Sequence, residues 1–146
     1  MNVGRLTGAC VVAIVAAALG SACGSSSAPE KPSFRDAPLV VIPSDAMKLS
    51  IEVRTAPDQP PERGVAAVQL VVKDETGAPV DGLDVATLPW MPAMGHGTSV
   101  MPTASMQGKG TYVLDNVYLY MPGHWELRTS FSGTVIDSAT PAFDVP

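Results

Sequence analysis

The stretch Lys48-Leu49-Ser50-Ile51-Glu52-Val53-Arg54 alternates polar and apolar residues with a period of two. Side chains of a β-strand point to opposite faces in turn, so this alternation predicts a strand with one buried face and one wet face. The sequence after Cys23 has no long window with a helical period. The stretch therefore indicates a domain that folds from half-buried strands.

Six further stretches carry the same kind of pattern and are separated by turn-forming residues. Thr76-Gly77-Ala78-Pro79 and Ser132-Gly133 are typical of turns, and Pro141 marks a break near the end of the chain. Short strands that alternate rather than run continuously apolar predict an all-β antiparallel sandwich of about seven strands. The expected strands are 48–54, 65–73, 83–88, 111–119, 125–131, 134–137 and 142–145, with a break or bulge at Asp115-Asn116.

The segment before the predicted domain has the features of an export signal followed by a tether. Arg5 precedes an apolar run at residues 9–19, and the small residues Gly20-Ser21-Ala22 end the segment. As a helix, this run would span only about 17 Å, against roughly 30 Å of bilayer hydrocarbon. We expect a signal peptide at 1–22, a flexible Gly-, Ser- and Pro-rich linker at 23–46 with disorder to about Pro43, and a folded domain at 47–146.

Cys23 lies directly after this signal. Leu19-Gly20-Ser21-Ala22-Cys23 resembles the lipobox of bacterial lipoproteins, although the leucine stands one place earlier than usual. The resemblance implies that Cys23 carries lipid and anchors the protein to a membrane of the cell envelope, facing the periplasm or the outside. A plain secreted protein that is cut near Cys23 is the alternative.

Cysteine and charge content restrict the chemistry of the folded part. Cys10 lies in the signal and Cys23 would carry lipid, so no cysteine remains for a disulfide or a thiolate metal site. Without residues 1–22, the chain has eight Lys and Arg against fourteen Asp and Glu, a net charge of −6 with both His neutral. An acidic chain with scattered charges and no basic cluster argues against nucleic-acid binding.

The stretch 90–106 concentrates soft metal ligands. It holds four methionines and a histidine and has neither a strand nor a helix period, so it predicts a loop. A thioether sulfur is soft and an imidazole nitrogen is borderline, so the mixture favours Cu(I) over hard cations. Met91, Met94, His96 and Met121 are the candidate metal ligands.

The geometry of an extended chain suggests how these ligands would converge. Met94 and His96 would point to the same side of an extended segment, because side chains alternate along it. Met91 would need the bend that Pro92 and Gly95 permit. Core packing is the competing explanation for each methionine, because methionine fills irregular gaps and contacts aromatic rings.

Four segments of the chain resemble a known family when taken together, in this order. They are Thr76-Gly77-Ala78-Pro79-Val80, Met91-Pro92-Ala93-Met94-Gly95-His96-Gly97, Gly110-Thr111-Tyr112 and Met121-Pro122-Gly123-His124-Trp125-Glu126-Leu127. They resemble the YtkA-like domain, which is related to the FixH-like proteins. The resemblance implies a small exported immunoglobulin-like β-sandwich, often lipid-anchored and loosely linked to copper handling and respiratory-oxidase assembly. Met91, Met94, His96, Met121 and Trp125 match the motifs of the family, whereas His124 falls in a variable slot.

These observations together predict a non-enzymatic, exported, lipid-anchored protein that binds copper as Cu(I). Gly-x-Ser-x-Gly, His-Glu-x-x-His and phosphate-loop motifs are absent from the sequence. The expected partners are the membrane, through the lipid on Cys23, and an envelope protein or copper acceptor, but no nucleic acid. The alternative is a structural or interaction module of the envelope whose Met-rich loop is a protein-binding surface. We expect Trp125 to anchor the core, His124 to lie at the surface and Tyr112 to make a corner hydrogen bond.

Overall fold

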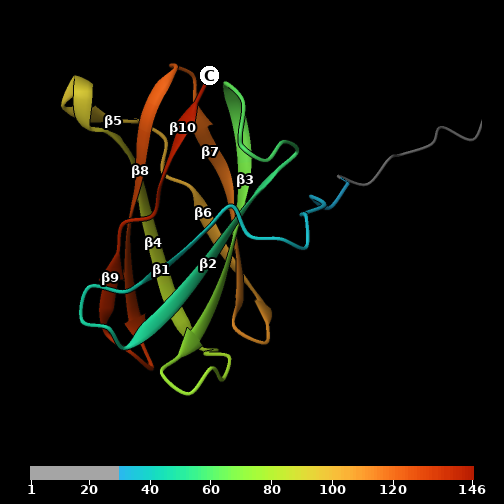
Figure 1. Ribbon diagram of the computed structural model, residues 1–146, viewed down its shortest axis with the longest axis vertical. Coiled ribbons are helices and arrows are strands. Elements are labelled where there is room, and N and C mark those ends of the chain that lie inside the picture. Colours follow the sequence, from blue (N-terminus) through green and yellow to red (C-terminus); the bar gives the residue numbers. More distant parts are fainter. Residues whose placement is uncertain (1–29) are drawn as a thin grey trace, which may run out of the picture. The chain divides into compact units, whose positions relative to one another are not determined.

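The computed structural model describes residues 30–146, which fold as two antiparallel β-sheets (Figure 1). The elements in chain order are β1 (Val40–Pro43), β2 (Leu49–Ala56), β3 (Gly64–Asp74), β4 (Leu83–Met91), the 3-10 helix η1 (Pro92–Met94), β5 (His96–Gly97), β6 (Thr103–Gly108), β7 (Thr111–Leu119), β8 (Gly123–Gly133), β9 (Asp137–Ala139) and β10 (Ala142–Val145). The predicted signal peptide at 1–22 and Cys23 lie outside the described residues.

The first sheet has the strand order β1-β2-β3-β7-β6. Its central strand β3 pairs with β2 from Ala67 to Asp74 and with β7 on its other side. Along β2 the buried and partly exposed residues alternate, as the period of two in the sequence predicted. One face of this sheet therefore packs in the core and the other is partly open to solvent.

The second sheet has the order β10-β8-β4-β5, and β9 also pairs with β8. The long strand β8 pairs along one edge with β4 and along the other with β10 and β9 in succession. Between these two short strands, the carbonyl of Pro141 accepts a hydrogen bond from the Leu127 N–H at 2.8 Å. Pro141 thus marks the break between two strands, as predicted.

The core lies between the sheets and is built from the inward-facing residues of both. Its largest fully buried side chains include Trp125, Tyr112 and Phe131. Full burial of a large apolar side chain contributes roughly 1.5–3 kcal/mol. The core residues are Leu49, Ile51, Val53, Ala66, Val68, Leu70, Val72, Leu83, Met91, Tyr112, Leu114, Val117, Leu119, Trp125, Leu127, Phe131, Ala139, Phe143 and Val145.

The structure confirms the predicted antiparallel sandwich but adds three strands, β1, β5 and β6. β1 pairs with β2 in four registers, from Val40 opposite Val53 to Pro43 opposite Ser50. The expectation of disorder to about Pro43, and of a domain that begins at Met47, is therefore wrong for these residues. Pairing with β2 satisfies the β1 backbone, a tertiary contact that linker composition cannot predict.

The stretch 90–106 is also more regular than the predicted loop. β4 continues through Pro89 to Met91, and β5 and β6 follow. Pro89 is tolerated because its carbonyl accepts the Thr98 N–H at 3.2 Å, on the β5 side. In an antiparallel sheet, the N–H and the C=O of one residue point toward the same neighbouring strand. The N–H that Pro89 lacks would therefore also have pointed toward β5, and no hydrogen bond to β8 is lost.

The predicted bulge and the predicted hydrogen bond of Tyr112 are confirmed. Asn116 has a φ of 62°, and the β3–β7 register shifts between Ala66 and Val68, opposite the predicted bulge. The Tyr112 hydroxyl donates to the Val80 carbonyl at 2.8 Å. The predicted turn at Ser132-Gly133 and strand at 134–137 are wrong, because β8 continues to Gly133, the chain bends at Thr134 and Val135, and β9 begins at Asp137. Among residues 30–146, no helix is both long and apolar enough to cross a lipid bilayer.

Candidate functional site

Met91 and His96 are paired across the short β4–β5 ladder, at one end of the second sheet. Figure 1 shows β5 and the η1 turn at the upper end of the sandwich, where the C-terminus also lies. Directly opposite residues of an antiparallel pair point to the same face, with Cβ atoms roughly 4.5–5.5 Å apart. The pairing therefore holds a thioether and an imidazole next to each other.

The η1 turn between these two residues sets their pairing. Pro92 occupies the start of the 3-10 helix, where its fixed φ and missing N–H are tolerated. Gly95 ends the helix with φ 67° and ψ 22°, and its N–H donates to the Met91 carbonyl at 3.0 Å. This left-handed conformation favours glycine. The turn then returns the chain beside β4, which confirms the predicted bend at Pro92 and Gly95.

His96 has one ring nitrogen engaged and one available. Nδ1 lies 3.2 Å from the carbonyl oxygen of Gly97, and the side chain is exposed. With the proton on Nδ1 donated to that carbonyl, Nε2 keeps its lone pair. A hydrogen bond of this kind orients the imidazoles of metal-binding histidines in proteins.

Met121 follows β7 and brings a third candidate ligand from the other side of the sandwich. Its side chain is half-buried and packs against the core. The indole N–H of buried Trp125 donates to the Met121 carbonyl at 2.9 Å and fixes the backbone there. Met91 also reaches this region, because a Cβ built on Gly123 would lie 2.9 Å from the Met91 methyl carbon.

A pocket of about 370 Å³ opens where these segments meet. His96 and Met121 both line it, together with the buried Trp125 ring. Its remaining walls are Gly97, Thr98, Ser99, Val100, Tyr118 and Tyr120. The pocket is thus aromatic and apolar, with an imidazole and a thioether at its surface.

Met94 does not belong to this pocket as the structure places it. It is the last residue of η1, its side chain is 57% exposed, and it is not among the residues that line the pocket. The expectation that an extended chain turns Met94 and His96 to one side is wrong, because 3-10 and left-handed residues replace the extended segment. Pro92 and Gly95 impose this local conformation.

The clustering of methionines along the sequence is only partly a cluster in space. Met106 accepts a hydrogen bond from the Gly82 N–H at its sulfur, 3.4 Å away, just before β4 begins. Met91 ends the same strand, roughly 26 Å away at about 3.3 Å per residue. Met101 is 54% exposed, so core packing does not account for it.

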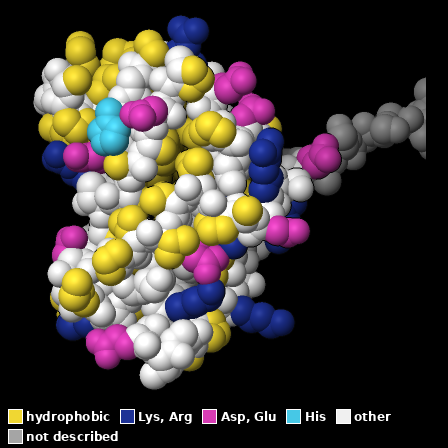
Figure 2. Space-filling view, viewed as in Figure 1, with side chains coloured by type: hydrophobic (Ala, Val, Ile, Leu, Met, Phe, Trp, Pro, Cys, Tyr) yellow, Lys and Arg dark blue, Asp and Glu magenta, His cyan; other side chains and the backbone are white. Residues whose placement is uncertain are grey.

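Carboxylates and histidines do not form a rival metal site in the part of the chain that the structure describes. Residues 30–146 contain no group of three or more His, Cys, Asp or Glu side chains that could hold a metal ion. His124 is a surface residue, as predicted, with Nδ1 2.9 Å from Asp144. Figure 2 shows Lys and Arg interspersed with Asp and Glu on one face of the protein.

The groups with shifted pKa values lie away from the end of the sandwich that carries Met91, His96 and Met121, which we call the rim. Hydrogen bonds from Lys73 and Arg54 lower the pKa of Glu52, on the first sheet. Burial raises the pKa of the Tyr112 hydroxyl, which lies at the core. The candidate site is therefore distinguished by its soft ligands and its apolar walls.

The sequence reasoning missed the pocket walls Tyr118, Tyr120 and Val100. The two tyrosine rings lie 5.4 Å apart between centroids and are tilted by 55°. Their spacing of two at the end of β7, just before Met121, was the available signal. Their convergence with the 96–100 segment depends on the packing of the two sheets, which the sequence pattern does not reveal.

The fold and this rim define a small antiparallel β-sandwich with methionine, histidine and aromatic side chains at one end. The family model of the YtkA-like proteins matches residues 45–130, more than half of the chain. The chain therefore belongs to the YtkA-like family.

Further comparisons add little about function. One similar solved structure is a copper-bound variant of FetP from uropathogenic Escherichia coli strain F11. It has 6% sequence identity and a TM-score of 0.48, and the match covers 76% of this chain and 96% of that chain. A likeness this distant carries no argument about what this chain binds. A comparison with curated proteins finds no match.

Proposed function

We propose that this protein is an exported, lipid-anchored copper-binding protein without enzymatic activity. Met91, His96 and Met121 would supply the ligands, and copper would be carried as Cu(I). The cross-strand pairing of Met91 with His96, beside a pocket shared by His96 and Met121, carries the proposal. Two thioethers and one imidazole form a soft donor set that suits Cu(I).

The environment of these ligands supports the same cation. Met91 is 4% exposed, so its sulfur is already largely dehydrated before a metal binds. Trp125 and the two tyrosines exclude water from one side of the pocket, while the exposed imidazole stays accessible. The β4–β5 ladder holds Met91 and His96, so these two residues lose less conformational entropy on binding than residues of a flexible loop would.

Copper handling by such a site would proceed by ligand exchange. Thioether and imidazole bonds are individually replaceable, and His96 is the ligand that an incoming acceptor can reach. The acceptor would displace His96 first and the buried Met91 last. Copper is therefore the cargo of the protein in this proposal, delivered to another protein of the envelope.

A competition titration tests the proposal. The unlipidated protein is titrated with Cu(I) in the presence of a chromogenic Cu(I) chelator, and the amount of metal withdrawn from the chelator is measured. We expect wild type to compete and the His96→Ala variant to compete much less at unchanged fold. Equal and poor competition by both proteins would remove the copper proposal.

One observation favours a second candidate, an interaction module of the cell envelope. Several apolar side chains near this rim are exposed: Met94 at 57%, Val100 at 40%, Met101 at 54% and Tyr120 at 60%. Methionine-rich surfaces adapt to different partners. A protein that fails to bind Cu(I), but loses a membrane-protein partner when Met94 and Met101 become Ser, would support this reading.

A further inference from the structure

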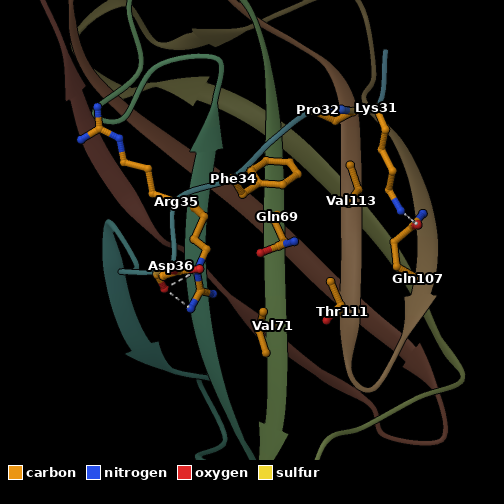
Figure 3. Close-up of a pocket in the computed structure, with 11 residues that line it drawn as sticks. Lys31, Pro32, Phe34, Arg35, Asp36, Gln69, Val71, Gln107, Thr111 and Val113 are labelled. Atoms are coloured by element: carbon orange, nitrogen blue, oxygen red, sulfur yellow. Dashed lines mark hydrogen bonds between the residues drawn. The ribbon is translucent and has the colours of Figure 1, made fainter. Parts of the chain in front are cut away.

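A second pocket lies on the outer face of the first sheet, away from the methionine–histidine rim. Its volume is about 440 Å³. Figure 3 shows residues 31–36, which we call the strap, crossing this face above β3 and β7. Gln69, Val71, Thr111 and Val113 form the floor, and the Phe34 ring lies above Gln69 (Figure 3).

Hydrogen bonds hold both ends of the strap. At one end, the Lys31 ammonium donates to the side-chain carbonyl of Gln107 at 2.9 Å. At the other end, Arg54 donates from Nε and Nη2 to the Asp36 backbone carbonyl, at 3.0 and 2.9 Å. These hydrogen bonds hold the strap against the outer face of the sheet.

The pocket offers more hydrogen-bond donors than the protein uses. The side chains of Gln69 and Thr111 are half-buried, line the pocket and can each donate a hydrogen bond. Lys31 uses one of its three N–H groups on Gln107. Arg54 Nη1 is buried and lacks a partner within the described part of the chain. Of these donors only Arg54 Nη1 is buried, whereas Gln69 and Thr111 are half-buried and Lys31 is exposed. A buried donor without an acceptor is costly, so Arg54 Nη1 favours a ligand that carries acceptor atoms.

Charge in the pocket opposes the charge of the whole protein. Three of the eight Lys and Arg residues after position 29 line it, against Asp36 alone of the fourteen acids. Glu52 neutralises part of Arg54 through an ion pair at 2.8 Å. The Arg35 side chain is directed away from the floor (Figure 3), so the positive charge that faces the pocket comes mainly from Lys31.

We propose that this pocket binds an oxyanion of the phosphate class. The donors belong to the strap, β2, β3 and β7, and thus surround the space from several sides, as a tetrahedral oxyanion requires. Phe34, Val71 and Val113 would cover an apolar part of the same ligand. The phosphate can be free or part of a lipid headgroup, since both present negatively charged oxygens that accept hydrogen bonds.

The neighbouring residue Arg35 provides an internal control. Figure 3 shows its side chain directed away from Gln69 and Thr111, although the residue borders the pocket. Replacing Arg35 or Lys31 by Gln removes the same charge from the same strap. A built site responds to Lys31→Gln alone, whereas general attraction of anions responds to both substitutions equally.

The experiment titrates the full chain with inorganic phosphate and follows backbone amide NMR shifts. We expect the amides of Gln69 and Thr111 to move in wild type and in Arg35→Gln. In Lys31→Gln the dissociation constant rises about tenfold, as expected for loss of a charge-assisted hydrogen bond. Thr111→Val tests the floor independently and should also weaken binding. Equal weakening in Lys31→Gln and Arg35→Gln, or no shift along β3 and β7, would overturn the proposal.

A second arm identifies the source of the phosphate. The same titration is run with water-soluble dihexanoyl phosphatidylglycerol below its micelle concentration. Tighter binding than inorganic phosphate, with shifts extending to Phe34 and Val113, assigns the site to a lipid headgroup. Equal binding assigns it to free phosphate, and binding of neither compound overturns the proposal. Because copper plays no part, these outcomes are separate from those of the copper titration.

Discussion

Met91 and His96 lie directly opposite each other in the β4–β5 ladder, so a buried thioether and an exposed imidazole occupy neighbouring places on one face. The two residues differ sharply in their access to solvent. Met91 belongs to the core, whereas His96 is reached from outside. A metal held between them would be bound by the buried sulfur of Met91 on the side of the core. On the solvent side it would be bound by the imidazole nitrogen of His96, which another ligand can replace.

We predict that the structure ranks the effects of ligand substitutions on Cu(I) affinity. Met91→Leu, Met121→Leu and His96→Ala should each raise the dissociation constant for Cu(I) by at least about tenfold, because each removes one donor of three. Met→Leu conserves volume and costs less than about 1.5 kcal/mol of stability even in a core. The affinities are measured by chelator competition, and the free energy of unfolding by urea titration.

Two methionines outside the pocket are the matched controls for this series. Met94→Leu should change Cu(I) affinity by less than about threefold, since Met94 lies exposed on η1. Met106→Leu, near the far end of β4, should leave the affinity unchanged. A loss in Met94→Leu as large as that in Met121→Leu would show that the η1 turn rearranges to bind copper.

We predict that Gly97 is essential for the geometry of the rim. A Cβ on this residue would lie 2.6 Å from the Pro89 carbonyl oxygen and 3.3 Å from the Trp90 ring. Gly97→Ala should therefore separate β5 from β4, displace His96 and cost about 1–3 kcal/mol of stability. Hydrogen exchange of the Thr98 amide, which bonds the Pro89 carbonyl, reports this separation directly.

Gly95 is the control for Gly97, because Gly95 is constrained by its backbone conformation and Gly97 by close contacts with neighbouring atoms. It has a left-handed φ but open space around its Cα. Gly95→Asn should be tolerated, since Asn adopts this conformation more readily than other side chains. If Gly97→Ala protects the Thr98 amide as well as wild type does, the close approach of β5 to β4 is not required.

The central strands of the fold could be predicted from the sequence because their burial alternates. Leu49–Ala56 buries one face against the second sheet, and the alternation of apolar and polar residues along it predicts this burial. β6 gives no such signal, since it is an edge strand whose residues are mostly exposed or half-buried. β1 is short and lies among residues of linker composition, so only its pairing with β2 reveals it.

The candidate site could be predicted by residue type more than by geometry. The soft side chains in Met-Pro-x-Met-Gly-His identified the rim from the sequence. The position of Met91 could be predicted from the bend at Pro92 and Gly95. That Met94 lies outside the pocket could not be predicted. It follows from the 3-10 geometry of η1, which depends on Pro92 and Gly95 and leaves no periodic pattern in the sequence. The tyrosine walls come from the end of β7 and the residue that follows it, and only the packing of the two sheets brings them to His96.

Cys23 provides a prediction that stems from the sequence alone. If Cys23 carries lipid, wild type should remain with the membrane pellet after a high-salt wash and enter solution with detergent. Cys23→Ser should release the protein without salt or detergent, because acyl chains supply most of the membrane affinity. Fractionation of cells followed by immunoblotting measures this. Membrane retention of Cys23→Ser, with a cleaved N-terminus, would rule out the lipid anchor.

We predict that Trp125 positions Met121 as well as filling the core. Trp125→Phe removes the indole donor and leaves the Met121 carbonyl without its 2.9 Å partner. The variant should lose about 2 kcal/mol of stability and weaken Cu(I) binding several-fold. Trp90→Phe is the control, since Trp90 lies under the Arg128 guanidinium, 4.3 Å from the ring centroid, and does not line the pocket. Equal Cu(I) affinities for the two variants would mean that Trp125 only packs.

Asp137 links the turn before β2 to β9 and should make stability depend on acid. Its carboxylate accepts hydrogen bonds from Ser44 Oγ at 2.5 Å and from the backbone N–H groups of Ala46 and Ser138. Burial opposes ionisation of Asp137, but these hydrogen bonds prevail and hold its pKa below the usual value near 3.8. The native state thus binds the proton less readily than the unfolded chain does.

The sign of the pH dependence follows from that difference. The stabilisation from Asp137 is fully present above about pH 4 and disappears as the pH falls through the lowered pKa of the native state. Asp137→Asn should cost about 1 kcal/mol at pH 7, and less as the pH falls below 4, in urea unfolding experiments. The pKa values of Glu52 and Asp74 are also lowered, but both titrate in wild type and variant alike and cancel in the difference. Asp115→Asn, at an exposed position, is the matched control. The difference in the free energy of unfolding between wild type and Asp137→Asn could instead stay constant as the pH falls. That result would mean that the Asn side chain does not fit the site sterically, and that the charge of Asp137 does not stabilise the turn.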